Sequence, residues 1–290
     1  MLVDRSGQRL LAVHAHPDDE SSKGAATLAR YAAEGAEVLV ATMTGGERGD
    51  VLNPALDRPE VRADLSRRRR AEMDRAREIL GVSQEFLGFV DSGLPANGEA
   101  LPEGCFAREP TGEAAAALVA LIRRFRPQVV VTYDPSGGYP HPDHVKVHEV
   151  SVAAFAAAGD PAAYPGSGEP WTPSKLYYTC AFSKVYFQAI YDGMTAAGRD
   201  SPHDEVLREW DDAMPVWPIT TRVGCADWFP VRLAAILAHE TQVDPHGPER
   251  SCPVEIEQEC WPTEDYHLAQ SLVDTAPAED DLFAGLTVRG

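Results

Sequence analysis

The chain has 290 residues, which is enough for one large α/β domain. Its 45 acidic residues outnumber the 26 basic ones, and the net charge of -19 argues against binding to nucleic acid or to an anionic membrane. Five scattered cysteines, no signal peptide and no apolar run of membrane-spanning length predict a cytoplasmic protein with reduced thiols.

The first half of the chain alternates short apolar runs with helical segments. We predict strands at 10–13, 38–41, 86–90 and 129–132, and helices at 21–34, 58–80, 112–126 and 141–158. This alternation is typical of a parallel sheet with helices on both faces, so we predict an α/β fold with a Rossmann-like, mostly parallel sheet. Ligands of such sheets bind beyond the carboxyl ends of the strands.

The alternation loosens after residue 158. We predict strands at 176–180 and 219–223, an edge strand at 254–257, and helices at 183–197 and 229–240. The acidic residues 279–281 indicate a surface strap or a disordered tail. We therefore divide the chain into a Rossmann-like, metal-binding catalytic core at 1–158 and a looser C-terminal α+β part at 159–290. The second part would complete the substrate site, so that both form one functional unit.

The segment His16-Pro17-Asp18-Asp19-Glu20 follows the first predicted strand. Proline favours the first position of a helix, so His16 would cap a helix that has Asp18 and Asp19 in its first turn. Side chains three apart share a helix face, so His16 and Asp19 can converge on one point. The segment can be a metal site with its own base, or a capped helix whose acidic first turn suits the helix dipole. The pentapeptide alone favours neither interpretation.

A second segment, His141-Pro142-Asp143-His144, has the same placement after the fourth predicted strand. Both segments therefore lie on the same rim of the sheet, which favours the metal site. His16, Asp19 and His144 form a set of two histidines and one carboxylate, which suits Zn²⁺ and also Fe²⁺. Three protein ligands leave a position for water, as in catalytic sites. Asp18 then remains as the general base and His141 as a cation that faces a developing oxyanion.

Together the two segments resemble the paired motifs of the LmbE-like metal-dependent amide hydrolases. The resemblance covers nearly the whole chain and is carried further by residues 14–24, 44–49, 88–93, 137–141 and 261–266. It is closest to members that cleave mycothiol S-conjugates into an N-acetylcysteine S-conjugate and glucosaminyl-inositol. It therefore implies a zinc-dependent amidase acting on a small thiol-pseudodisaccharide, in thiol detoxification or in an antibiotic pathway. The alternatives are a deacetylase of N-acetylglucosaminyl-inositol and a non-catalytic sugar- or thiol-binding protein on the same fold.

The resemblance also implies a role for individual residues. His16, Asp19 and His144 would be the metal ligands, Asp18 the base and acid, and His141 the electrophilic partner. Tyr139 would lie beside the scissile carbonyl, and Asp143 would tune a neighbouring histidine. The other interpretations are that Tyr139 only packs in its Gly-Gly-Tyr-Pro loop and that Asp143 only stabilises a helix start.

Four further residues would bind substrate by the same resemblance. Glu47, Arg69 and Asp91 could bind the sugar and inositol hydroxyls, which need charged hydrogen-bonding groups. Lys23 is the residue that separates the amidase from the deacetylase. The alternatives are a solvated position for Arg69 within the arginine run 67–70 and a helix-surface position for Lys23.

One segment departs from the family pattern. Residues 246–253, His-Gly-Pro-Glu-Arg-Ser-Cys-Pro, are less aromatic than is typical of the amidases at this point. If this segment borders the site, we expect the chain to accept a different substituent on the thiol.

Overall fold

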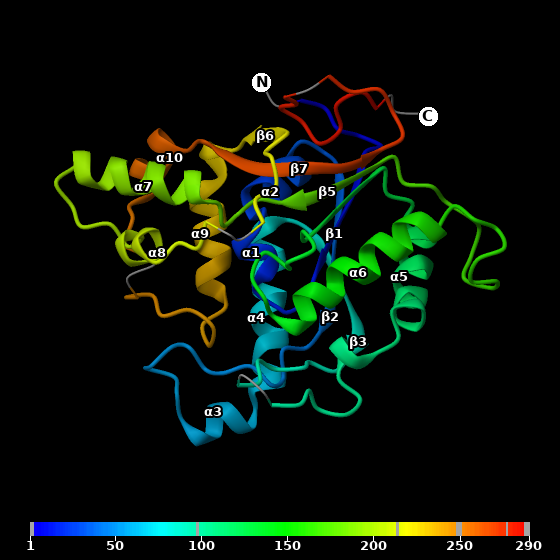
Figure 1. Cartoon of the computed structure of the whole chain (residues 1–290), viewed down its shortest axis with the longest axis horizontal. Coiled ribbons are helices and arrows are strands. Elements are labelled where there is room, and N and C mark those ends of the chain that lie inside the picture. Colours follow the sequence, from blue (N-terminus) through cyan, green and yellow to red (C-terminus); the bar gives the residue numbers. More distant parts are fainter. Residues whose placement is uncertain (1–2, 97–98, 213–214, 248–250, 277, 287–290) are drawn as a thin grey trace.

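One seven-stranded sheet runs through the computed structural model, which describes residues 3–96, 99–212, 215–247, 251–276 and 278–286 (Figure 1). The strands are β1 (Arg9–His14), β2 (Glu37–Thr44), β3 (Ser83–Phe89), β4 (Val129–Thr132), β5 (Lys175–Thr179), β6 (Thr221–Gly224) and β7 (Thr263–Ser271). Their order is β3-β2-β1-β4-β5-β7-β6, and the first five are parallel while β7 runs antiparallel to both neighbours. The predicted α/β class and mostly parallel sheet are confirmed.

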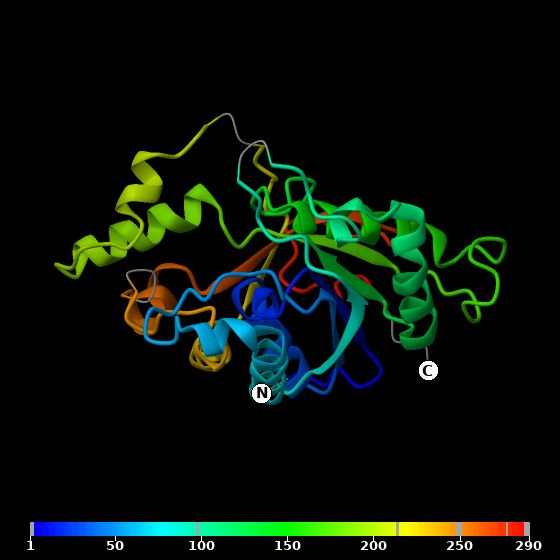
Figure 2. The ribbon, with the colours of Figure 1, turned by 90° about the horizontal axis from the view of Figure 1, so that it is seen from below.

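Helices cover both faces of this sheet. They are α1 (Asp19–Ser22), α2 (Ala25–Ala33), α3 (Pro59–Ala63), α4 (Leu65–Leu80), α5 (Thr111–Phe125), α6 (Pro142–Ala157), α7 (Lys184–Ala196), α8 (Asp204–Arg208), α9 (Phe229–Ala238) and α10 (Val254–Cys260). Successive side chains of a strand point to opposite faces. Leu10 and Ala12 of β1 pack with α2, α4 and α9, whereas Leu11 and Val13 pack with α5 and α6. Figure 2 shows these helices as two layers with the sheet between them.

The predicted helix at 21–34 is interrupted at Lys23 and Gly24, between α1 and α2. Gly24 has φ 110°, and a Cβ at this position would lie 2.9 Å from the hydroxyl of Tyr266. The break therefore lets β7 approach the chain closely at the start of α2. The predicted helix at 58–80 is likewise two helices, which meet at Asp64.

The prediction of an edge strand at 254–257 was wrong. These residues form the first turn of α10, which starts after Pro253 and carries Glu255 and Glu257 in that turn. The apolar–polar alternation of four residues was too short to separate a strand from a helix. The sheet instead contains β7 as a strand. Its sequence is polar and its side chains alternate poorly between buried and exposed, so the sequence did not predict it.

The prediction of a disordered tail at 279–281 was wrong, whereas the alternative of a surface strap holds for Asp280, which is exposed. Glu279 is buried, and its carboxylate accepts hydrogen bonds from Lys175 Nζ at 2.6 Å and from the Tyr177 hydroxyl at 2.6 Å. Asp281 pairs with Arg5 at 2.8 Å. The acidic composition misled the prediction because the cations that neutralise these carboxylates are distant in sequence.

The cysteines and the lengths of the helices agree with two of the predictions made from composition. All five cysteines lie in the described part of the chain as free thiols. Among the helices of the described ranges, none combines the length and apolar character that a bilayer crossing requires.

Candidate active site

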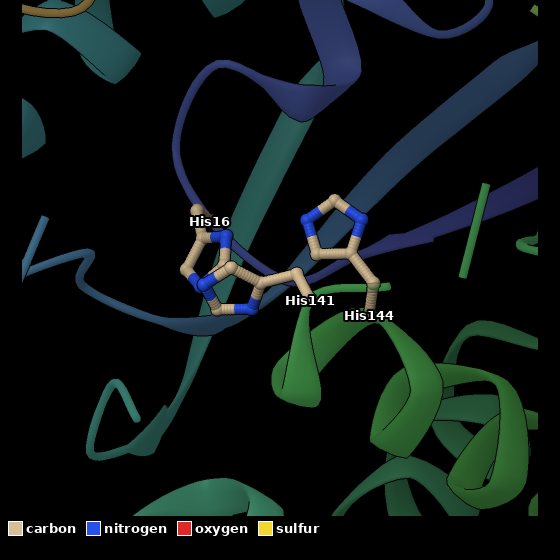
Figure 3. A group of neighbouring side chains, drawn as sticks. All are labelled: His16, His141 and His144. Atoms are coloured by element: carbon tan, nitrogen blue, oxygen red, sulfur yellow. The ribbon is translucent and has the colours of Figure 1, made fainter. Parts of the chain in front are cut away.

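The site forms where the strand order of the sheet reverses. Strands β1 and β4 are neighbours, but the chain runs from β1 towards one edge of the sheet and from β4 towards the other edge. Such a switch point leaves a crevice at the carboxyl ends of the strands. His16 lies in the loop after β1, and His141 and His144 lie at the start of α6, after β4. Figure 3 shows the three imidazole rings gathered between these two segments.

The predicted ligand set comes together in this crevice. Asp19 Oδ2 lies 3.6 Å from His16 Nδ1 and 3.3 Å from His144 Nε2. His144 donates its other ring nitrogen, Nδ1, to the carbonyl of Gly137 at 3.0 Å. The buried Nε2 therefore carries a lone pair and has no hydrogen-bond partner among the described residues. A buried imidazole with one nitrogen anchored and the other free fits a metal ligand.

Two other groups of side chains could also hold a metal ion, namely His16 with His141 and His144, and His16 with Asp91 and Asp143. In the second group, His16 Nε2 lies 3.1 Å from Asp143 Oδ2 and 3.4 Å from Asp91 Oδ1. These carboxylates already accept hydrogen bonds from the backbone of Ser92, Gly93 and Arg48. They are therefore better suited to orient His16 than to bind the ion themselves.

The protonation of His16 reflects these neighbours. Burial opposes its charged form, but hydrogen bonds to Asp143, Asp19 and Asp91 hold its pKa well above the usual value. Asp143 thus contacts a neighbouring histidine, the one that the resemblance would have it tune. Asp91 was predicted to bind substrate, yet it lies behind His16 and is only 1% exposed.

Asp18 lies on the open side of this set. Its backbone has φ 116°, an unusual left-handed conformation, and its N–H donates to Glu20 Oε2 at 2.9 Å. Its carboxylate is partly exposed and lies 3.3 Å from Arg69 Nη2. Burial raises the pKa of Asp18, although the charge of Arg69 opposes this effect. A partly exposed carboxylate with a raised pKa suits a proton acceptor.

A buried ion pair behind Asp18 escaped the sequence analysis. His239, at the end of α9, donates from Nε2 to Glu20 Oε1 at 2.8 Å, and both side chains are fully buried. Burial opposes the charge of each partner, but their mutual attraction lowers the pKa of Glu20 to about 2 and raises that of His239. Glu20 stood inside the first motif, whereas nothing in the sequence marked His239.

His141 differs from the expected cation. Its Nδ1 accepts the N–H of Asp143 at 3.1 Å, and burial together with the charge of His16 lowers its pKa to about 4. The ring is therefore a neutral imidazole that presents Nε2–H. Tyr139 is 39% exposed, with its ring centroid 4.5 Å from that of His144. Burial raises the pKa of Tyr139, so its hydroxyl stays protonated.

Two of the remaining predicted residues, Lys23 and Arg69, are more buried than a surface position allows. Lys23 is 5% exposed, and its Nζ lies 2.5 Å from Asp19 Oδ1. Arg69 is 3% exposed and donates to the carbonyls of Pro17 and Gly46. The solvated alternatives for both residues are therefore wrong. Glu47 is partly buried and accepts the N–H of Asp91 at 3.0 Å.

A cavity of about 750 Å³ opens next to this site, between α7, α9, α10 and β7. Ser22 and Gly24, on either side of Lys23, form part of its wall. Ser251, Cys252 and Pro253 of the segment that departs from the family pattern line it as well, while residues 248–250 lie outside the described residues. This segment therefore borders the cavity.

Comparison with known proteins decides the family. Residues 11–155 match the family model described as PIG-L, GlcNAc-PI de-N-acetylase. A mycothiol S-conjugate amidase of Streptomyces coelicolor is 52% identical over 96% of this chain and 97% of its own length. The chain belongs to the PIG-L family. The resemblance to the LmbE-like hydrolases is thereby confirmed.

Other relatives of this PIG-L protein have a second activity. The 1D-myo-inositol 2-acetamido-2-deoxy-alpha-D-glucopyranoside deacetylase of Geodermatophilus obscurus is 42% identical, over 96% of this chain and 98% of its own. Among solved structures, a conserved protein of Thermus thermophilus matches with a TM-score of 0.60 and 24% identity, covering 92% of this chain and 96% of that one. This likeness shows the shared fold. The PIG-L protein is thus an enzyme that hydrolyses amide bonds, as predicted.

Proposed function

We propose that this PIG-L protein is a zinc-dependent amidase that cleaves mycothiol S-conjugates. The observation that carries the proposal is the position of Lys23. This buried cation contacts the carboxylate of Asp19, and the residues on either side of Lys23 line a cavity of about 750 Å³. An amidase substrate carries a large thioether group next to its scissile carbonyl. The 52% identity to an S-conjugate amidase supports the same substrate class.

His16, Asp19 and His144 would hold Zn²⁺, with Fe²⁺ as the alternative, since two histidines and one carboxylate suit both ions. The bound ion would supply Lewis acidity that lowers the pKa of a water molecule and polarises the scissile carbonyl. The carboxylate of Asp143 would orient the His16 ring, because its Oδ2 lies 3.1 Å from His16 Nε2.

Asp18 acts as the proton-transfer group. It takes the proton of the attacking water and returns it to the departing glucosamine nitrogen. Arg69 and Glu20 hold Asp18 in place, since they contact its carboxylate and its backbone N–H. His141 donates its Nε2–H to the developing oxyanion, and Tyr139 supplies a hydroxyl on the exposed side.

His141→Ala should keep its metal and lose about 10²–10³ in kcat, which is the effect of removing one oxyanion donor. His148→Ala is the matched control, because His148 lies on the same helix but hydrogen-bonds to the Tyr133 carbonyl. Zinc content by mass spectrometry and steady-state kinetics measure both effects. A metal-free His141→Ala protein would show instead that His141 is a ligand.

Lys23→Ser should lower kcat/KM for mycothiol S-conjugates more than for N-acetylglucosaminyl-inositol, shifting the ratio by roughly tenfold. A charged hydrogen bond is worth about 1.5–3 kcal/mol, and only the conjugate offers the extra carbonyl groups to receive it. Lys146→Ser serves as control, because Lys146 bonds to Thr111 and Glu149, away from the metal site. An unchanged ratio at full zinc content would remove Lys23 from substrate selection.

The second candidate is deacetylation of N-acetylglucosaminyl-inositol, which is favoured by relatives with that activity at 37–43% identity. The chemistry would be the same, but on an acetyl group. Wild-type kcat/KM for that substrate and for a mycothiol S-conjugate distinguishes the two activities. A zinc-loaded protein that hydrolyses neither would favour a non-catalytic sugar- or thiol-binding role.

A further inference from the structure

The walls of the 750 Å³ cavity are rich in aromatic and aliphatic side chains. Phe182 precedes α7, Tyr186 and Phe187 belong to α7, Ile236 to α9, and Trp261 follows α10. Helix α7 packs against α10, where a Cβ on Gly193 would lie only 2.0 Å from Cys260 Sγ. Because the two helices cross so closely, they form one continuous wall on this side. Figure 2 shows α7 and α8 extending away from the sheet.

The charged groups in the cavity wall are largely paired with one another. Arg232 binds Glu257 at 2.5 Å and lies 3.6 Å from Glu264, and the Tyr186 hydroxyl donates to the other oxygen of Glu257 at 2.8 Å. Burial raises the pKa of the Cys180 and Cys252 thiols to about 12 and about 11, so both are uncharged at neutral pH. These groups therefore suit an uncharged, polarizable ligand better than a charged one.

Two side chains, Phe182 and Lys23, lie between the cavity and the metal site. Phe182 lines the cavity, and its ring centroid lies 5.4 Å from Lys23 Nζ, which in turn contacts Asp19 at 2.5 Å. A substrate whose carbonyl lies at the metal site would reach the cavity past Lys23 and Phe182. An acetyl methyl group would leave almost all of this volume empty, since pockets of 300–1,000 Å³ typically bind drug-sized ligands.

We propose that this cavity is the subsite for the S-substituent of the conjugate, and that it selects large aromatic or aliphatic thioethers over small ones. The proposal rests on the proposed amidase function and adds that the enzyme distinguishes its substrates by their S-substituent. The thioether carbon chain would pass Lys23 and Phe182, and the apolar group would bury itself against α7 and Trp261.

Two mycothiol conjugates that differ only in the substituent, S-naphthylmethyl and S-methyl, test the proposal. We expect the wild-type kcat/KM to be about tenfold or more higher for the naphthylmethyl conjugate, because a few extra apolar carbons in a matched pocket give such factors. Cys252→Trp should fill the cavity and lower kcat/KM for the naphthylmethyl conjugate to about the value for the S-methyl conjugate, which abolishes the preference. Leu233→Trp, which fills the cavity from α9, should have the same effect.

The control is His246→Trp, the same new side chain on the exposed part of the same segment, which should retain the wild-type preference. Zinc content and thermal unfolding confirm that each variant is folded. A preference that survives in both filling variants would overturn the subsite while leaving the amidase in place. An equal loss on both conjugates would overturn it too. A wild-type protein that hydrolyses neither conjugate would overturn the amidase itself.

Discussion

Asp18→Asn is expected to reduce turnover by about 10²–10⁴, the contribution of a positioned proton-transfer group, while the protein keeps its full zinc content. Asparagine preserves the size of the side chain but cannot accept a proton from water. It also tolerates positive φ better than most residues, so the left-handed backbone at φ 116° should persist. Alanine would be a less informative replacement, because it changes the backbone preference as well as the chemistry.

Steady-state kinetics and metal analysis of the same preparation measure this effect. Asp64→Asn is the matched control, since Asp64 lies at the surface and pairs with Arg67. If Asp18→Asn lost its zinc, Asp18 would be a ligand and the base would lie elsewhere. If it retained wild-type turnover, proton transfer would not depend on this carboxylate.

His144→Ala should yield a protein without stoichiometric metal and without measurable amidase activity. The loss should exceed the roughly 10–100-fold effect of removing a residue that only orients a ligand. The reason is the buried Nε2 of His144, which makes no hydrogen bond in the described part of the chain and lies 3.3 Å from the carboxylate of Asp19. Zinc titration with a chromophoric chelator measures metal affinity independently of turnover.

The comparison variant is Asp91→Asn, because Asp91 belongs to the alternative group with His16 and Asp143. If the ion binds His16, Asp19 and His144, Asp91→Asn should retain metal with at most the smaller loss expected of an orienting residue. The reverse result, with metal retained in His144→Ala and lost in Asp91→Asn, would place the ion on the other side of His16.

The convergence of the two motifs could be predicted from sequence because it follows from topology alone. The carboxyl ends of parallel neighbours meet at one rim, and each motif lies in the connection that follows a buried strand. The relation of Asp19 to His16 also followed from local spacing, since the two are three residues apart. Both relations could be predicted because each depends only on a strand and the few residues that follow it.

Other features depended on contacts that no short segment contains. Lys23 resembled a surface lysine, yet the chain breaks at Gly24 and buries it against Asp19. Arg69 stands in a run of four arginines, of which it is the one bonded to Pro17 and Gly46. Polar strands such as β7 are placed by their neighbours in the sheet, so their own periodicity does not predict them.

The pairing of Glu20 with His239 has a consequence for the order of events during synthesis. The two residues are 219 positions apart, so the first motif leaves the ribosome long before its partner is made. Strand β5 likewise emerges with one edge uncovered until β7 arrives. Because distant contacts form only after long loops close, the backbone at Asp18 should be the last part of the metal site to reach its final shape. Nascent chains that end before α9 would thus contain every metal donor without a properly held base.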